Sequence, residues 1–349
     1  MRELKQTPAS MVESGKVVEY GLFQSPFKNI NILEANIYPD KKVPSFLRKY
    51  RLKEWQHYVL ITDEISMGFV ISDTHYMSMS FCYVVDQKTG EYFEHHREKL
   101  GQKSRLSREL WDDKCEYISP DYALEFHNNL AENKHEAKIR IRRDGNKPAI
   151  KVDLTMHEDL ENIQPLITVL PISENRPLYT HKAAVAVSGE VNIGKRKIVL
   201  DAEKDIVLID VQKTYYPYKT HWRWATFAGY DKSGNLLAMN LVKNIITDDE
   251  TYNENVFWVN GKLHPLSAAN FIINEDDFMA PWKISTTDGK CNLTFNPVGE
   301  RADKINMGLI VSDYHQPYGK YSGTMVDSDG NSYEIEGLHG VTELHLAKF

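Results

Sequence analysis

The sequence lacks any long hydrophobic run. Nowhere do eighteen apolar residues follow one another, so we expect no membrane-spanning segment. Cysteine is scarce, with three residues in 349, and no Cys-x-x-Cys pair occurs. Three widely spaced thiols argue against a disulfide framework or a zinc site, and are typical of a reducing compartment. The first residues also lack an apolar signal segment, and we therefore expect a cytoplasmic protein.

The chain also lacks an excess of basic residues. Its 42 lysines and arginines are outnumbered by 49 acidic residues, which gives a net charge of −7. Nucleic-acid binding needs a basic face that neutralises phosphates, so we expect no nucleic-acid partner. The glycine-rich loops of nucleotide enzymes, the Gly-x-Ser-x-Gly elbow of serine hydrolases and the His-Glu-x-x-His helix of zinc proteases are all missing. We therefore expect no cofactor and no metal site.

The second half of the chain contains a series of tight-turn signals. Asn-Gly and Asp-Gly pairs favour hairpins because their residues tolerate positive φ angles. The intervening segments are rich in β-branched and aromatic residues and have no helical period, so they are predicted strands. The turn signals are Asp231-Lys232-Ser233-Gly234, Asn260-Gly261, Asp288-Gly289 and Asp329-Gly330, and the strands between them include 222–230, 236–246, 256–259, 283–287 and 292–296.

The first half repeats this pattern less regularly. Two stretches interrupt the predicted strands, 44–54 and 104–113, and each is predicted to form two or three helical turns. Ser104 and Ser107 are suitable N-caps for the second stretch. The predicted strands of this half are 52–62, 67–72, 75–85, 92–96, 122–127, 136–142 and 149–156.

A domain boundary is predicted near residue 165. There the sequence becomes polar and then places Pro165, Pro171 and Pro177 six residues apart, which is unfavourable inside a sheet. The boundary gives one domain of residues 1–164 and another of residues 165–349. Each half has enough strands to close a sheet on itself. The sequence therefore predicts an all-β protein of two consecutive antiparallel β-barrels with a few short helices.

Several stretches of the chain resemble one known family. They include YGLFQSPFKNINILEAN (20–36), HWRWATFAGYDKSGNLLAMNLV (221–242), ENVFWVNGKLHPLSAANF (254–271), SDYHQPYGKYSGTMVDSDG (312–330) and LHGVTELHLAK (338–348). These are similar to the family catalogued as domain of unknown function 2804, and the resemblance extends in order over nearly the whole chain. Because that family is named for its missing function, the resemblance implies little chemistry.

The layout is more remotely similar to the two-barrel, lipocalin-like proteins that include carotenoid 1,2-hydratases, tocopherol cyclases and certain fungal Diels–Alderases. This similarity rests on the two-domain all-β pattern and on the Trp-x-Trp run of Trp222 and Trp224. It implies lipocalin- or calycin-like barrels that bind a mostly apolar molecule, which a few polar groups protonate or orient. Fold does not fix function, so the candidate residues carry the argument.

The predicted strand that begins at His221 has two chemically different faces. Alternation places His221 and Arg223 on one face and the two tryptophans on the other. Tryptophans that point inward would line a ligand cavity or fill the core. If His221 and Arg223 point inward instead, a cation and an imidazole indicate an anionic or polar ligand.

Carboxylates beside aromatic or histidine side chains are the candidates for proton transfer. Glu254 shares a strand face with Trp258, and burial there would raise its pKa; the plainer interpretation is a rim glutamate paired with Lys243. Glu343 and His345 share a face of the closing strand, where they can transfer protons or simply hydrogen-bond to one another. They could supply two metal ligands, but no further ligands lie near them in the sequence.

The leading hypothesis is a protein that binds a small, partly apolar organic molecule and acts as a cofactor-independent acid/base enzyme of hydratase, isomerase or cyclase type. The alternatives are a non-catalytic lipid or isoprenoid carrier and a carbohydrate-active enzyme with paired carboxylates. The sequence leaves the oligomeric state open. The candidate catalytic residues are Asp210, His221, Glu254, Glu343 and His345, and Asp210 would form an acid/base unit with His221 if the two met. The candidate ligand-binding residues are Tyr216, Tyr218, Trp222, Arg223, Trp224, Asn240, Asn255, Trp258 and Gln316.

Overall fold

The computed structural model describes residues 2–38, 41, 43–306 and 308–348. Its regular secondary structure is almost entirely strand, which confirms the all-β prediction. Within the described residues, helix is limited to α1 (Ser45–Arg48) and three single 3₁₀ turns, η1 (Ile32–Glu34), η2 (Lys49–Arg51) and η3 (Leu130–Glu132). In the part of the chain described, no helix has both the length and the apolar character needed to cross a bilayer.

The chain divides into two compact units. The N-terminal unit comprises Lys5–Val169 and Ser173–Tyr215, and the C-terminal unit comprises Met1–Leu4, Leu170–Ile172 and Tyr216–Phe349. This division differs from the expected boundary near residue 165. The reason is that β15 (Arg176–Ile193), which contains Pro177, and β17 (Ile206–Thr214) pair with β13 (Ile150–His157) and β5 (Lys53–Ile61) of the preceding sequence.

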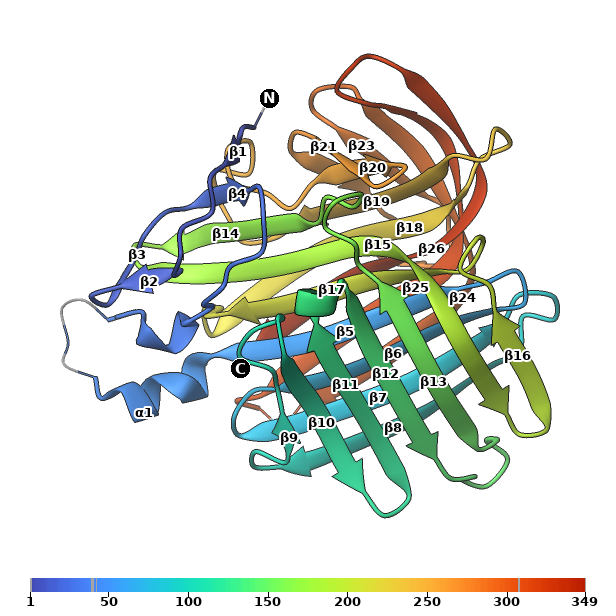
Figure 1. Cartoon of the computed structure of the whole chain (residues 1–349), viewed down its shortest axis with the longest axis horizontal. Coiled ribbons are helices and arrows are strands. Elements are labelled where there is room, and N and C mark those ends of the chain that lie inside the picture. Colours follow the sequence, from blue (N-terminus) through green and yellow to red (C-terminus); the bar gives the residue numbers. More distant parts are fainter. Residues whose placement is uncertain (1, 39–40, 42, 307, 349) are drawn as a thin grey trace. The chain divides into compact units, whose positions relative to one another are not determined.

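The N-terminal unit is built on one curled antiparallel sheet, blue through green to yellow-green in Figure 1. Its strand order is β8-β7-β6-β5-β17-β15-β13-β12-β11-β10-β9, with β14 and β16 paired to β15 and β4 paired to β14. The remaining bounds are β1 (Leu4–Lys5), β2 (Val12–Glu13), β3 (Lys16–Val17), β4 (Gly21–Phe23), β6 (Ile65–Asp73), β7 (Met77–Asp86), β8 (Tyr92–Leu100), β9 (Ser104–Arg105), β10 (Asp113–Ser119), β11 (Tyr122–Asn129), β12 (Lys134–Ile141), β14 (Leu166–Ser173) and β16 (Arg196–Leu200).

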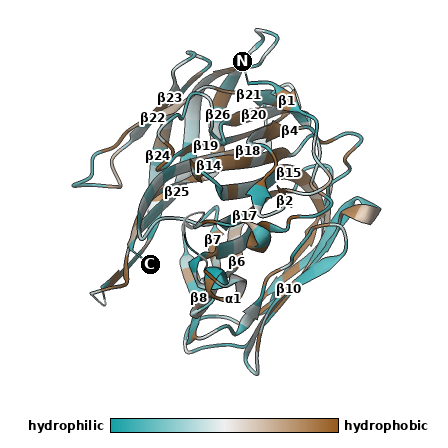
Figure 2. Cartoon of the chain, turned by 90° about the vertical axis from the view of Figure 1, so that its left-hand side faces the viewer, coloured by the Kyte–Doolittle hydropathy of each residue, from teal (hydrophilic) through white to brown (hydrophobic). Residues whose placement is uncertain are grey.

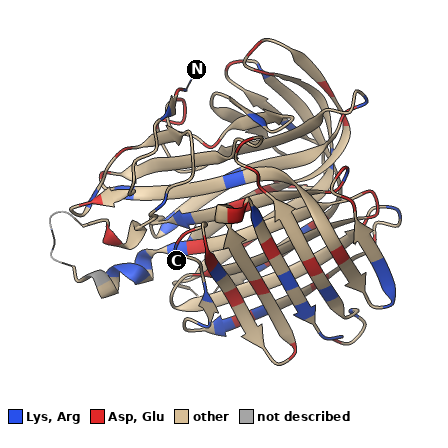
Figure 3. Ribbon diagram, viewed as in Figure 1, with Lys and Arg blue, Asp and Glu red and all other residues tan. Residues whose placement is uncertain are grey.

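Alternation of side chains explains why these segments form a sheet with one apolar face. In β12, His135, Ala137 and Ile139 are buried in the core, whereas Lys138 and Arg140 are exposed. This alternation of apolar and polar residues can be followed along the strands in Figure 2. On the outer face, acidic and basic residues of β11, β12 and β13 lie next to one another (Figure 3), and Lys138 of β12 lies between Glu125 and Asp153, which favours this pairing.

The C-terminal unit is a second antiparallel sheet of nine strands, in the order β21-β20-β19-β18-β26-β25-β24-β23-β22. Its core contains Phe227, Leu241, Phe257, Trp282 and Leu344. The strand bounds are β18 (Lys219–Tyr230), β19 (Leu236–Lys243), β20 (Val256–Val259), β21 (Lys262–Pro265), β22 (Ala269–Ile272), β23 (Trp282–Thr286), β24 (Cys291–Asn306), β25 (Val311–Val326) and β26 (Ser332–Lys348).

The predicted turns of the second half are all present. Each of the four Asn/Asp-Gly signals joins two strands that pair with one another: β18 with β19, β20 with β21, β23 with β24, and β25 with β26. At Asn260-Gly261 both residues have positive φ, 49° and 83°, which matches the twist required of a two-residue hairpin. The local sequence therefore determines the register of these hairpins.

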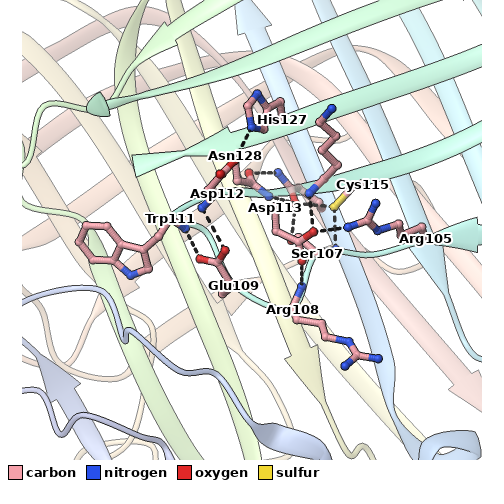
Figure 4. A network of polar contacts seen from close by, with 12 residues as sticks. Arg105, Ser107, Arg108, Glu109, Trp111, Asp112, Asp113, Cys115, His127 and Asn128 are labelled. Atoms are coloured by element: carbon pink, nitrogen blue, oxygen red, sulfur yellow. Dashed lines mark hydrogen bonds and ion pairs between the residues drawn. The ribbon is translucent and has the colours of Figure 1, made fainter. Parts of the chain in front are cut away.

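The helix expected over 104–113 does not form, whereas the stretch at 44–54 does contain α1 and η2. Residues 104–105 form β9, and the loop that follows is held by two carboxylates (Figure 4). Asp113 accepts a hydrogen bond from the backbone N–H of Arg108 at 2.7 Å, and Glu109 accepts one from Asp112 N at 3.0 Å. Acidic side chains that bind local N–H groups compete with helical hydrogen bonds, which explains the failed prediction.

Candidate active site

The core contacts of β18, which contains His221, show which of its two faces points into the core of the C-terminal unit. Ala225 and Phe227 of β18 belong to the core of the C-terminal unit. Because side chains alternate, Trp222 and Trp224 point to the opposite face of this sheet, where Trp224 packs with Val341 in a separate cluster. The tryptophans therefore do not fill the core of their own sheet; they line its second face.

Glu343 lies at the centre of the polar groups on this second face. It is buried, and both carboxyl oxygens have partners from neighbouring strands. Trp222 Nε1 donates to Oε1 at 2.6 Å, and Gln316 Nε2 donates to Oε2 at 2.8 Å. The Tyr314 hydroxyl also hydrogen-bonds to the carboxyl group. Burial raises the pKa of Glu343, although these three donors and the charge of Arg301 oppose the rise.

His345 lies beside this carboxyl group, two residues further along β26. Its ring centroid is 4.4 Å from that of Trp222 and 5.2 Å from that of Tyr314, and both contacts are edge-to-face. Its Nε2 is 2.8 Å from the Ser312 hydroxyl. Burial, followed by the charge of Arg301, lowers the pKa of His345 to about 3. The ring is therefore neutral at physiological pH and cannot act there as a cation.

Four residues selected from the sequence thus come together in one site: Trp222, Gln316, Glu343 and His345. Tyr216 joins them by stacking on Trp222, with ring centroids 5.5 Å apart and planes at 13°. Sequence reasoning missed Arg301, Ser312 and Tyr314. The signal for Tyr314 was available, because it lies two residues before Gln316 on the same strand and must share its face.

The side chains of Trp224, Asn240 and Asn255 form hydrogen bonds that hold neighbouring strands and loops together. Trp224 Nε1 donates to Asn240 Oδ1 at 2.8 Å, and Asn240 Nδ2 donates to the carbonyl of Glu254 at 2.7 Å. Asn255 accepts from Val242 N at 2.7 Å and donates to the Ser267 carbonyl at 2.9 Å. These bonds tie the loop before β20 to β19. Trp258, on β20 itself, is buried.

Glu254 is buried beside a cation that the sequence did not indicate. The Arg2 guanidinium donates to the carbonyls of the two residues that flank it, Asn253 at 2.6 Å and Asn255 at 2.5 Å. Lys243, which the sequence suggested as the partner of Glu254, forms an ion pair with Asp249 at 3.6 Å. Arg2 also lines a cavity of about 500 Å³, together with Glu250, Thr251, Pro265, Leu266, Ser267, Asp288 and Lys290.

Three further candidates lie at the surface of the C-terminal unit. His221 and Tyr218 are exposed, and Arg223 forms a half-exposed ion pair with Glu275 at 2.9 Å. The Tyr218 hydroxyl donates to the carbonyl of Leu309 at 2.6 Å. These contacts give no support to a role in proton transfer.

Asp210 belongs to the N-terminal unit, on β17. Its carboxylate is 3.4 Å from the Lys182 ammonium group, and it lies opposite His57 in the register of β5. His221, with which it would form an acid/base unit, belongs to the C-terminal unit. Lys182 and His57 come from strands far from Asp210 in sequence, so no local pattern indicated them.

The interior of the N-terminal unit holds a second buried carboxylate. Glu158 accepts hydrogen bonds from His135 Nε2 at 2.8 Å and His181 Nε2 at 2.7 Å, and all three side chains are buried. Burial alone would raise the pKa of Glu158, but the two imidazoles outweigh it and lower that pKa to about 2. A carboxylate that stays ionised and fully paired stabilises the fold rather than donating protons.

A group of side chains that could hold a metal ion is found among the described residues, at His264, Asp327 and Asp329. Asp327 Oδ1 already accepts the backbone N–H of Asp329 at 2.8 Å and of Asn331 at 2.9 Å. These are the bonds of an aspartate turn, which forms without a metal. The group therefore does not carry a metal assignment.

Comparison with known proteins places the whole chain in one family and one fold. The family model described as "Domain of unknown function (DUF2804)" matches residues 1–349. No curated protein matches the sequence. Among solved structures, the chain is similar to CghA with Sch210972, with a TM-score of 0.54, 9% identity, and coverage of 85% of this chain and 88% of that chain. It is also similar to kievitone hydratase from Nectria haematococca, with a TM-score of 0.51, 10% identity and the same coverage. This likeness confirms the expected lipocalin-like fold.

Proposed function

The chain belongs to the DUF2804 family, and for this member we propose an acid/base enzyme that transfers a proton to or from a small, partly apolar molecule, with Glu343 as the proton carrier. The observation that carries the proposal is the buried Glu343 carboxyl group with a raised pKa, held between Trp222 Nε1 and Gln316 Nε2. A carboxyl group whose pKa is shifted toward neutrality is matched to proton transfer near neutral pH.

Each neighbour of Glu343 has a defined part in this reaction. The protonated carboxyl group gives its proton to the substrate, and the carboxylate that remains keeps the two donors at 2.6 and 2.8 Å. These donors stabilise the ionised form without reorganisation, which lowers the barrier to transfer. A proton released by the product or by water restores the acid. Tyr216, Trp222 and Tyr314 surround the carboxyl group with aromatic side chains, and these apolar surroundings suit a partly apolar molecule.

The structural neighbours support a reaction of this class, because one of them is named as a hydratase and another was crystallised with a small molecule. Two alternatives make different predictions. A lipid or isoprenoid carrier binds the same kind of molecule without changing it. A carbohydrate-active enzyme binds sugars and needs a second carboxylate near Glu343 or Glu254.

The test combines ligand discovery with proton exchange. Native mass spectrometry and organic extraction of protein purified from a cell lysate identify a bound molecule, which is then incubated with the protein in D₂O. We expect deuterium incorporation into carbon, or net conversion, with the wild type and a loss of at least about 100-fold in Glu343→Gln. Glu334→Gln is the matched control, because Glu334 is exposed on the same strand. Binding without exchange would identify a carrier, and selective binding of sugars would favour the carbohydrate alternative.

A further inference from the structure

Arg301 of β24 brings a buried positive charge to the Glu343 site. It lies opposite Gln316 in the pairing of β24 with β25, so both side chains project to the same face. Its guanidinium is 4.9 Å from the ring centroid of Tyr314, and only 6% of the residue is exposed. Its charge acts on both titratable groups of the site, Glu343 and His345.

The aromatic surfaces of the site are largely occupied by neighbouring side chains. Tyr216 covers one face of Trp222, and His345 packs its ring against the same indole. The face of Tyr314 is occupied by the Arg301 guanidinium. A substrate carbocation would need such faces for stabilisation, and it would also be repelled by the adjacent arginine.

We propose that Arg301 makes this site select conjugated carbonyl compounds, which pass through an enolate, rather than isolated alkenes, which pass through a carbocation. The inference rests on the proposed role of Glu343 and adds a substrate class to it. At a separation of about 6 Å and an effective dielectric constant of about 20, one unit charge favours an anion over a neutral group by roughly 100-fold. A cation at the same position is disfavoured relative to a neutral group by the same factor.

The reaction balances with water, or a hydroxyl group of the substrate, as the nucleophile. The nucleophile adds to the β-carbon of the conjugated carbonyl, and the electrons of the C=C bond move to the carbonyl oxygen to form the enolate. Arg301 stabilises that oxyanion. Glu343 then gives its proton to the α-carbon, which restores the C=O bond, and the proton lost by the nucleophile returns to Glu343. No electrons are gained or lost overall, so no redox partner is required.

The test uses three probes of one shape and different charge: 2-naphthoate, naphthalene and 2-naphthylmethylammonium. Binding is measured by quenching of tryptophan fluorescence, so the result does not depend on turnover. We expect wild type to bind the anion at least 10-fold more tightly than the cation, Arg301→Gln to lose this preference, and Arg301→Lys to retain most of it. Lys320→Gln is the control, because Lys320 is an exposed lysine on the neighbouring strand β25.

The outcomes separate this inference from the proposed function. Equal binding of the three probes, tighter binding of the cation or no binding of 2-naphthoate would overturn the role of Arg301, even if the enzyme exchanges protons. A preference for the anion that survives in Arg301→Gln would overturn it as well. If the preference depends on Arg301 but Glu343→Gln exchanges protons as fast as wild type, the anion site stands and the role of Glu343 is wrong.

Discussion

Trp222 lies opposite His345 in the pairing of β18 with β26, yet its indole N–H donates diagonally to Glu343, which lies opposite Trp224. The bond is 2.6 Å long and joins residues 121 positions apart in sequence. One tryptophan therefore contacts both titratable groups of the site, with its ring against His345 and its nitrogen toward Glu343. The two tryptophans of the Trp-x-Trp run are thus not equivalent, because Trp224 donates to Asn240.

Replacement of Trp222 by phenylalanine keeps an aromatic ring for Tyr216 to stack on and removes the donor to Glu343. We expect a further rise in the pKa of Glu343, because its ionised form loses a hydrogen bond. Substrate turnover should fall by about 10–100-fold, and stability by about 1–3 kcal/mol. Steady-state kinetics and urea unfolding measure the two effects. Trp224→Phe should lower stability alone, and an equal loss of turnover in that variant would contradict the assignment.

The pH dependence of turnover should follow the protonation of Glu343. Its raised pKa means that the acid form persists above pH 4.5, the ordinary value for glutamate. Proton donation is therefore retained at acidic pH and falls as pH rises through the pKa of this group, by tenfold per unit. His345, with a pKa of about 3, is neutral throughout this range. It therefore causes no additional change in the pH–rate profile above pH 4.5. A profile that rises with pH would assign Glu343 as the base instead.

Acid should destabilise the N-terminal unit through Glu158. The pKa of this carboxylate is lowered from 4.5 to about 2, so its stabilising effect is complete above pH 4.5 and is lost as pH falls toward 2. At 1.36 kcal/mol per pKa unit, the loss is about 3 kcal/mol. Guanidinium unfolding at several pH values measures it. Glu158→Gln should be less stable at neutral pH by about 3–5 kcal/mol and lose this acid sensitivity, whereas the exposed control Glu161→Gln should keep it.

A methyl group at Gly340 should destabilise the C-terminal unit at the strands that carry the site. A Cβ there would lie 2.1 Å from the carbonyl oxygen of Thr226, a backbone atom that cannot move without breaking the β18–β26 pairing. We expect Gly340→Ala to cost about 1–3 kcal/mol, measured as a loss of thermal stability. Gly229→Ala is the control, because the nearest atom there belongs to the flexible side chain of Leu338, and it should cost less.

The turns and the strand character of this protein follow from short stretches of its sequence. Positive φ angles at Asn260 and Gly261 and strand alternation depend on each residue and its immediate neighbours, so the second-half hairpins and the all-β class could be predicted. The loop over 106–112 could not, because the carboxylates of Glu109 and Asp113 compete with the backbone for the same N–H groups.

Which candidate residues share a site depends on the pairing and packing of distant strands. From the local sequence, either face of β18 could point into the core. Phe227 packs into the core of the folded chain, and Trp222 therefore lies on the opposite face. The partners of Glu343 come from β18, β24 and β25, whose pairing with one another and with β26 is a property of the folded sheet. The pKa of Glu343 depends on burial and on those partners together. For this reason the sequence could identify Glu343 as a candidate acid, but the chemical surroundings of that acid, including Arg301, exist only in the folded chain.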